Sequence, residues 1–137
     1  MKTRSTDILT SIAITAAVLL ACVSAVPACD PSDPAASSGV PRTAKVGTLS
    51  AADAARLCDW TNQRQGGYGQ HVTCTGSEDM STDPDQKTCT DAEPDIAAYC
   101  PDLTVGDVED CTNAVGTDLC KYTTAAACAT LRACLGT

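Results

Sequence analysis

Phenylalanine is absent from this sequence of 137 residues, and the aromatic residues are only Trp60, Tyr68, Tyr99 and Tyr122. Cationic residues are also scarce: nine Lys and Arg stand against 17 Asp and Glu, which gives a formal net charge of -8. A protein that binds nucleic acid neutralises phosphates with clustered Lys and Arg. The composition therefore predicts no nucleic-acid partner.

Patterns of catalytic residues are equally scarce. The sequence has one histidine, His71, and no Gly-x-Ser-x-Gly segment. A hydrolytic triad needs a histidine within hydrogen-bond reach of a nucleophile and a carboxylate that orients it. Nothing near His71 supplies this pattern, so we interpret His71 as an exposed residue without a catalytic role. We predict that the protein is not an enzyme and needs no cofactor.

Metal-binding patterns are missing as well. Structural zinc sites usually take two ligands from a Cys-x2-Cys or Cys-x4-Cys turn, whereas the closest pair, Cys128 and Cys134, has five residues between its members. The acidic stretch 78–95 lacks the glycine and the bidentate Glu that an EF-hand loop starting at Asp91 requires. We predict no metal site and interpret this stretch as a solvated acidic surface.

The N-terminus predicts export. Lys2 and Arg4 precede an uncharged apolar run over 8–20, which has the order and length of a secretory signal peptide. The run ends in Leu19-Leu20-Ala21-Cys22, which resembles the lipobox of bacterial lipoprotein precursors. That resemblance implies a signal peptide over 1–21, cleavage before Cys22, and acylation of Cys22, so that the mature chain binds a membrane through its lipid.

Two other fates of the leader remain open. Small residues follow in Val23-Ser24-Ala25 and Val26-Pro27-Ala28, where cleavage by a peptidase for soluble proteins would give a secreted product. No charged residue occurs from Ile8 to Cys29, which is just long enough for an uncleaved membrane anchor. All three fates place the rest of the chain outside the cytoplasm, in the cell envelope or beyond it.

Residues 22–48 are predicted to form a disordered tether. Four of the seven prolines lie there, among Ala, Ser, Gly and Asp. Such a composition buries too little apolar surface to offset the entropy lost on ordering. The tether would leave residues 49–137 as the one compact domain.

That domain is poor in aliphatic residues and rich in cysteine. Only eleven of its 89 residues are Leu, Ile or Val, while eight are Cys. A core this small can hold a unique fold when disulfides restrict the unfolded chain, and disulfides form in oxidising compartments. We predict that all eight are disulfide-bonded, in a pairing that the sequence leaves open, and that Cys29 is the odd thiol. The eight are Cys58, Cys74, Cys89, Cys100, Cys111, Cys120, Cys128 and Cys134.

Local patterns in the domain predict helices. Ser50 with Asp53, and Thr104 with Asp107, have the spacing of a capping box at a helix start. Gly66-Gly67 predicts the end of the first of these helices.

Two further helices are expected. One begins at Asp83-Pro84 and ends at Pro94, and the last extends from about Thr124 to Leu135, with Gly136 behind it. No segment alternates as a strand does. The predicted fold is all-α, a small disulfide-cross-linked bundle of three or four short helices.

The domain resembles the uncharacterised cysteine-rich lipoproteins that are common in myxobacterial genomes. The segments that carry this resemblance are 57–60, 66–69 with Cys74, and 103–109 with Cys111, followed by Cys120, Cys128 and Cys134. Together they cover most of residues 50–135. The resemblance implies an envelope lipoprotein and brings no activity with it.

Two functions remain in view for the domain. In the first, it is a displayed interaction or structural module whose protein or glycan partner is unknown, with Trp60 and Tyr68 as the ligand-contact candidates. The favoured role of Trp60 is nevertheless in the core, because large side chains are so few. The alternative is a secreted carrier of a lipid or another small apolar molecule, which requires a contiguous apolar pocket inside the bundle.

Overall fold

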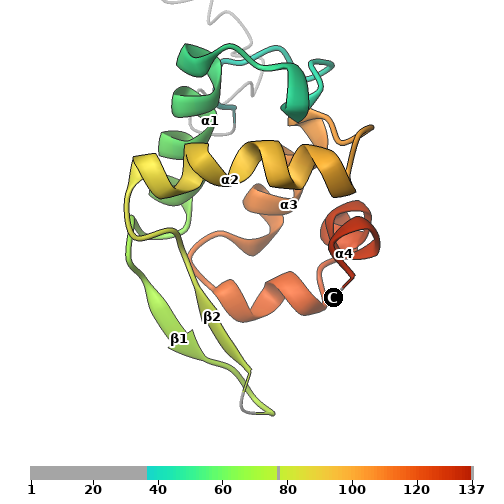
Figure 1. Ribbon diagram of the computed structural model, residues 1–137. Helices are drawn as coiled ribbons and strands as arrows, with labels where there is room; N and C mark the ends of the chain where they lie inside the picture. Colours follow the sequence, from blue (N-terminus) through green and yellow to red (C-terminus); the bar gives the residue numbers. More distant parts are fainter. Residues whose placement is uncertain (1–36, 77, 137) are drawn as a thin grey trace, which may run out of the picture. The chain divides into compact units, whose positions relative to one another are not determined.

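The computed structural model describes residues 37–76 and 78–136, and these residues confirm the predicted small all-α, disulfide-cross-linked domain (Figure 1). Four α-helices and one short hairpin occur within them. In chain order, the elements are η2 (Val46–Thr48), α1 (Ala51–Arg64), β1 (His71–Thr73), β2 (Asp79–Ser81), α2 (Gln86–Tyr99), α3 (Val105–Val115), η3 (Leu119–Thr123), η4 (Ala126–Cys128) and α4 (Ala129–Leu135), where η marks a 3-10 helix.

The predicted N-caps Ser50 and Thr104 are both confirmed, and the full capping box forms at Thr104. The Asp53 amide donates to Ser50 Oγ over 3.2 Å at the start of α1. At the start of α3, the Thr104 side chain and Asp107 form the reciprocal pair of hydrogen bonds of a capping box. The predicted end of α1 is also confirmed, because Gly66 and Gly67 follow it with positive φ angles.

Helix α2 differs from its prediction at both ends. Asp85 is its N-cap and accepts a hydrogen bond from the Thr88 amide over 2.8 Å. The helix passes through Pro94 and ends at Tyr99, so the prediction that Pro94 ends it was wrong. A proline removes only one helix hydrogen bond, and the helical bonding resumes behind it, where the Cys100 amide donates to the Ile96 carbonyl over 2.7 Å.

The predicted last helix over 124–135 is interrupted. Ala125 is extended, and the segment forms η4 before α4 begins at Ala129. The Arg132 guanidinium donates to the carbonyls of Tyr122 and Ala125 over 2.6 and 2.8 Å. These bonds stabilise the bend that interrupts the predicted single helix. Gly136 ends α4 in the left-handed conformation, as predicted.

The hairpin was not predicted. Its strands have three residues each and pair antiparallel, with Val72 opposite Met80. Three residues are too few for an alternation of apolar and polar positions to stand out. In Figure 1 the outer end of the hairpin projects beyond the helices, while both strands contact η3, and Cys74, just behind β1, forms a disulfide with Cys120 in η3.

Residues 37–48, which we call the N-terminal strap, correct the predicted domain boundary. Val40 and Val46 are buried in the core. The Val46 amide donates to the Leu103 carbonyl over 3.0 Å, and the Val105 amide donates to the Ala44 carbonyl over 2.9 Å. The prediction of a disordered tether over 22–48 was therefore wrong for 37–48, because bonds to a distant segment order a stretch of low apolar content. Residues 22–36 lie outside the described residues.

The core has two parts. The first core cluster draws on the strap, α1, α2 and α3, and the second on α3 and the 3-10 segments behind it. The buried members of the first cluster are Val40, Val46, Leu57, Trp60, Cys100, Leu103 and Val105, and those of the second are Cys111, Val115, Leu119 and Cys128.

All eight domain cysteines form disulfides, as predicted, and each bond joins two different parts of the domain. The bonds are Cys58–Cys89 between α1 and α2, Cys74–Cys120 between the hairpin and η3, Cys100–Cys134 between the end of α2 and α4, and Cys111–Cys128 between α3 and η4. Cys22 and Cys29 lie outside the described residues.

Candidate functional site

The two predicted ligand-contact residues lie in different environments. Trp60 is buried in the first core cluster with 9% of its surface exposed, which favours its core role over stacking on a ligand. Tyr68 is half-buried, and its hydroxyl donates to Asp59 Oδ1 over 2.9 Å. Partial burial and this bond raise the pKa of Tyr68 well above its ordinary value. The phenol is therefore a neutral group that orients α1 against the turn behind it.

His71 and the described acidic residues of the stretch 78–95 do not gather into one site. His71 is exposed on β1. Asp85 caps α2, and Asp91 forms an ion pair with Lys87 on the same helix. Among the described residues, no group of three or more His, Cys, Asp or Glu is arranged to hold a metal ion.

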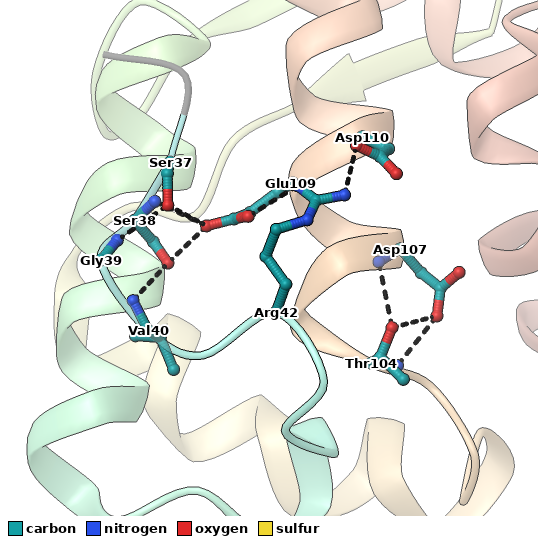
Figure 2. A network of polar contacts seen from close by, with 9 residues as sticks. All are labelled: Ser37, Ser38, Gly39, Val40, Arg42, Thr104, Asp107, Glu109 and Asp110. Carbon is teal, nitrogen blue, oxygen red and sulfur yellow. Dashed lines mark hydrogen bonds and ion pairs between the residues drawn. The ribbon is translucent and has the colours of Figure 1, made fainter. Parts of the chain in front are cut away.

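The most unusual polar group is Glu109 on α3, whose side chain is fully buried. Its Oε1 accepts hydrogen bonds from Ser37 Oγ over 3.1 Å, from the Ser38 amide over 2.6 Å and from Ser38 Oγ over 2.8 Å. Its Oε2 accepts from Arg42 Nη1 over 2.9 Å. Figure 2 shows the carboxylate reaching from α3 to the strap, with Arg42 beside it.

Arg42 connects this carboxylate to the surface. Its Nη2 donates to Asp110 Oδ1 over 2.7 Å, and 47% of its side chain is exposed. The hydrogen bond and the charge of Asp110, with a similar contribution from Glu109, raise the pKa of Arg42 further, so the guanidinium remains charged. A buried carboxylate is tolerable only when charge and hydrogen bonds compensate for its lost hydration, and here both oxygens are occupied.

These contacts define the role of Glu109 as a clasp that fastens the N-terminal strap to α3. Four donors contact its two oxygens, three at Oε1 and one at Oε2, and all four belong to the strap. The sequence contains one signal for it. Glu109 lies one helical turn after Val105 and belongs to the buried face of α3, and a charge on a buried face indicates a partner elsewhere in the chain.

A partly open cavity of about 190 Å³ lies between the helices. All four helices contribute to its wall, and nearly all of the contributing side chains are apolar or belong to a disulfide. The lining residues are Val46, Leu57, Cys58, Thr61, Asp83, Cys89, Ala92, Ile96, Leu103, Val108, Leu131 and Leu135.

One polar group in this wall lacks a hydrogen bond. Thr61 Oγ1 is buried and forms no hydrogen bond within the described part of the chain. Thr61 and Asp83 are the only polar residues of the wall other than the disulfide sulfurs. A buried hydroxyl without a partner costs free energy, and such groups are rare in native proteins. The oxygen atom has less than 1 Å² of accessible surface, so it does not face the open space of the cavity.

The cavity adjoins a hollow of about 330 Å³, with which it shares Asp83, Leu131 and Leu135. Leu135 is 40% exposed and is one of two large apolar residues that the described part of the chain leaves open to solvent, the other being Tyr99. The end of α4 thus lies between the cavity and this hollow.

Comparisons with protein families, with curated proteins and with solved structures find no match for this chain. Among the described residues, no helix has the length and apolar character to cross a membrane. The four disulfides indicate that the domain resides outside the cytoplasm, where such bonds persist.

Proposed function

We propose that this is an exported protein that is acylated at Cys22, and that its disulfide-cross-linked domain is displayed at a cell-envelope membrane as an interaction or structural module. The observation that carries the proposal is the complete pairing of the eight domain cysteines. This pairing agrees with the export that the leader predicts and with the lipobox-like segment 19–22.

The ordered strap limits the distance between the proposed lipid anchor and the folded domain. Because the domain already includes Ser37, at most residues 22–36 remain between an acylated Cys22 and the folded part. The disordered tether that the sequence predicts would, at that length, span about 20 Å. The domain would therefore be presented close to the membrane surface, and a partner would approach it from the aqueous side.

The surface near the end of α2 suits such a partner. Tyr99 is 74% exposed and borders a hollow of about 240 Å³ together with Pro101, Asp102 and Thr130. An exposed aromatic ring beside hydroxyl and carboxylate groups can pack against a protein or a glycan and hydrogen-bond to it. We therefore add Tyr99 to Tyr68 as a contact candidate for a protein or glycan partner.

Metabolic labelling with radioactive palmitate in the native host tests the proposed anchor. The wild type is expected to incorporate label and to fractionate with membranes, and Cys22→Ser is expected to do neither. Cys29→Ser is the matched control and should label as the wild type does. Equal labelling of wild type and Cys22→Ser, or no label in either, refutes acylation at Cys22.

The second candidate function, a secreted carrier of a small apolar molecule, is favoured by one specific observation, the partly open cavity between the helices, whose wall is mainly apolar.

A further inference from the structure

We infer that a surface hollow between the hairpin and the segment that leads into α4 binds a short peptide with free termini. The C-terminal carboxylate of the peptide pairs with Arg132, and its ammonium group meets Glu78 and Asp79. The hollow is partly open and has a volume of about 650 Å³. Its lining residues are Glu78, Asp79, Met80, Tyr122, Thr123 and Arg132. This site is separate from the Tyr99 surface and does not depend on acylation of Cys22, so its failure would leave the proposed function untouched.

Arg132 is a cation without a carboxylate partner in an acidic protein. Five of the seven Lys and Arg residues that the structure describes form ion pairs with Asp or Glu. Arg132 instead donates through Nη1 to the carbonyls of Tyr122 and Ala125. Its Nε and Nη2 form no hydrogen bond within the described part of the chain, and both remain accessible to solvent.

The free edge of this guanidinium suits a carboxylate. Nε and Nη2 lie on one edge of the planar group, and such an edge binds a carboxylate through two parallel hydrogen bonds. The two carbonyls hold Arg132 from its other side, so less side-chain freedom is lost on binding. The ligand therefore carries a carboxylate.

The hairpin side of the hollow is acidic. Glu78 precedes β2 and Asp79 begins it, and both residues are exposed. Thr73 Oγ1 donates to Asp79 Oδ1 over 2.9 Å, which holds this carboxylate on the hairpin. Neither acid forms an ion pair with Arg132, although all three residues line the same hollow. A ligand with one charge of each sign therefore complements both sides, whereas a simple anion would be repelled by the acids.

Met80 and Tyr122 supply the apolar part of the hollow. Both side chains are half-buried and pack against the second core cluster. A thioether and an aromatic ring adapt to apolar side chains of varied shape. The termini of a short peptide are separated by its backbone, and an apolar side chain lies between them. We therefore favour a peptide over a free amino acid, whose two charges adjoin one carbon.

A disulfide fixes the two sides of the hollow relative to each other. Cys74, just behind β1, is bonded to Cys120 in η3. Both strands of the hairpin also contact η3, and Figure 1 shows the hairpin beside the turns that precede α4. The acidic side and Arg132 are thus positioned before a ligand arrives, which lowers the cost of ordering the site on binding.

Titration of the exported, 15N-labelled full-length chain with the tripeptide Ala-Leu-Ala tests the site, with amide signals as the readout. We expect saturable shifts with one peptide per chain, largest at Met80, Tyr122 and Thr123. Amidation of the peptide C-terminus should weaken binding about tenfold, because the hydrogen bonds to a charged group are lost. Acetylation of the N-terminus should weaken it about threefold, since Glu78 and Asp79 are exposed. Free leucine should bind more weakly than the tripeptide.

Variants assign each charge to its side of the hollow. Arg132→Gln should weaken Ala-Leu-Ala about tenfold and should bind the amidated peptide no more weakly than the wild type does. Its matched control is Arg56→Gln, an exposed position of α1 outside the hollow.

The acidic side has its own variant. Glu78→Gln/Asp79→Asn should weaken Ala-Leu-Ala about threefold and should not weaken the acetylated peptide. Asp95→Asn is the matched control, because Asp95 is exposed on α2 and does not line the hollow.

Three results overturn the inference. The first is shifts that rise without saturation in the wild type. The second is equal affinity for the free, the amidated and the acetylated tripeptide, and the third is binding of free leucine as tight as that of Ala-Leu-Ala. Arg132 also holds the bend before α4, so if Arg132→Gln unfolds that segment, the comparison of the peptides on the wild type decides together with Glu78→Gln/Asp79→Asn.

Discussion

The two core clusters of this domain are built from different materials. The first is made mainly of Val, Leu and Trp side chains that converge from the strap and three helices. In the second, two of the four buried members are Cys111 and Cys128, bonded to each other, and Val115 and Leu119 are the only buried aliphatic residues. In the second cluster, disulfide sulfur therefore fills space that aliphatic side chains fill in the first.

The strap accounts for much of this difference. It delivers Val40 and Val46 to the first cluster and is held there by Glu109, by Arg42 and by backbone hydrogen bonds to the segment around Thr104. The hairpin packs Val72 and Met80 against the second cluster, but both side chains are only half-buried. A disulfide that closes a loop of 17 residues secures this cluster instead. The Cys111–Cys128 disulfide therefore has two functions: it restricts the unfolded chain and it fills part of the core.

The largest effect is expected from removing the Cys111–Cys128 disulfide of the second cluster. This variant tests whether sulfur replaces aliphatic side chains in that cluster. The double variant Cys111→Ala/Cys128→Ala loses about 3 kcal/mol of loop entropy, and the deletion of two buried sulfurs brings the expected loss in free energy of unfolding to about 5 kcal/mol. The measurement is urea denaturation of the exported chain.

The matched control is Cys74→Ala/Cys120→Ala. This bond closes a longer loop, over a separation of 46 residues, but both of its cysteines are only half-buried. Loop entropy alone predicts a cost of about 4 kcal/mol for this control, more than the entropy term for the core bond. If the control proves costlier than the core variant, the disulfides act through the unfolded chain and the core-filling function is disproved.

A smaller effect is expected from the clasp of the first region. Glu109→Ala leaves Arg42 and the Ser38 amide without their partner and should cost about 3 kcal/mol, the low end for a broken buried pair because Arg42 is half exposed. Trypsin should then cleave after Arg42 in the otherwise folded chain. The control is Asp110→Ala, which removes the exposed partner of Arg42 and should cost under about 1 kcal/mol. Equal costs for the two variants would show that burial of Glu109 adds nothing.

The features that the sequence analysis predicted correctly depend on near neighbours. The Ser50 and Thr104 caps each act over three residues, so their geometry follows from the local pattern. Burial of Trp60 followed from the shortage of large side chains. Cysteine content and the shortage of aliphatic residues together predicted that every domain cysteine is bonded.

The features that it missed depend on distant partners. Ser38 lies 71 residues from Glu109, and nothing near Ser38 in the sequence indicates this contact. The disulfide pairing is likewise a property of the packed helices. Pro94 shows the reverse case, in which a strong local signal for ending a helix is outweighed by packing of α2 against α1 and η2. The cavity could not be predicted, because it is the space left after four helices have packed.

The smallest predicted effect is a loss of stability at low pH, which should differ between the two regions. Hydrogen bonds from Thr88 lower the pKa of Asp85, and the hydrogen bond and charge of Lys45 lower that of Asp102. A carboxyl whose pKa is lower in the folded than in the unfolded chain stabilises the fold above its unfolded pKa, and that contribution is lost as the pH falls through its folded pKa. The start of α2 and the strap should therefore lose protection below about pH 4, while the second cluster, held by a bond that does not titrate, should keep it.

Hydrogen exchange, corrected for the intrinsic effect of pH on the exchange rate, provides the measurement. Protection of the amides of Val46 and Val105, which bond the strap to the start of α3, should decline below pH 4 in the wild type. Asp102→Asn cannot form the charged pair with Lys45, so its strap amides should have lower protection at pH 7 and a weaker dependence on acid. A decline that already begins near pH 6, or one that also appears at Cys111, would mean that the two regions unfold as a single unit and that the difference in their materials has no consequence for stability.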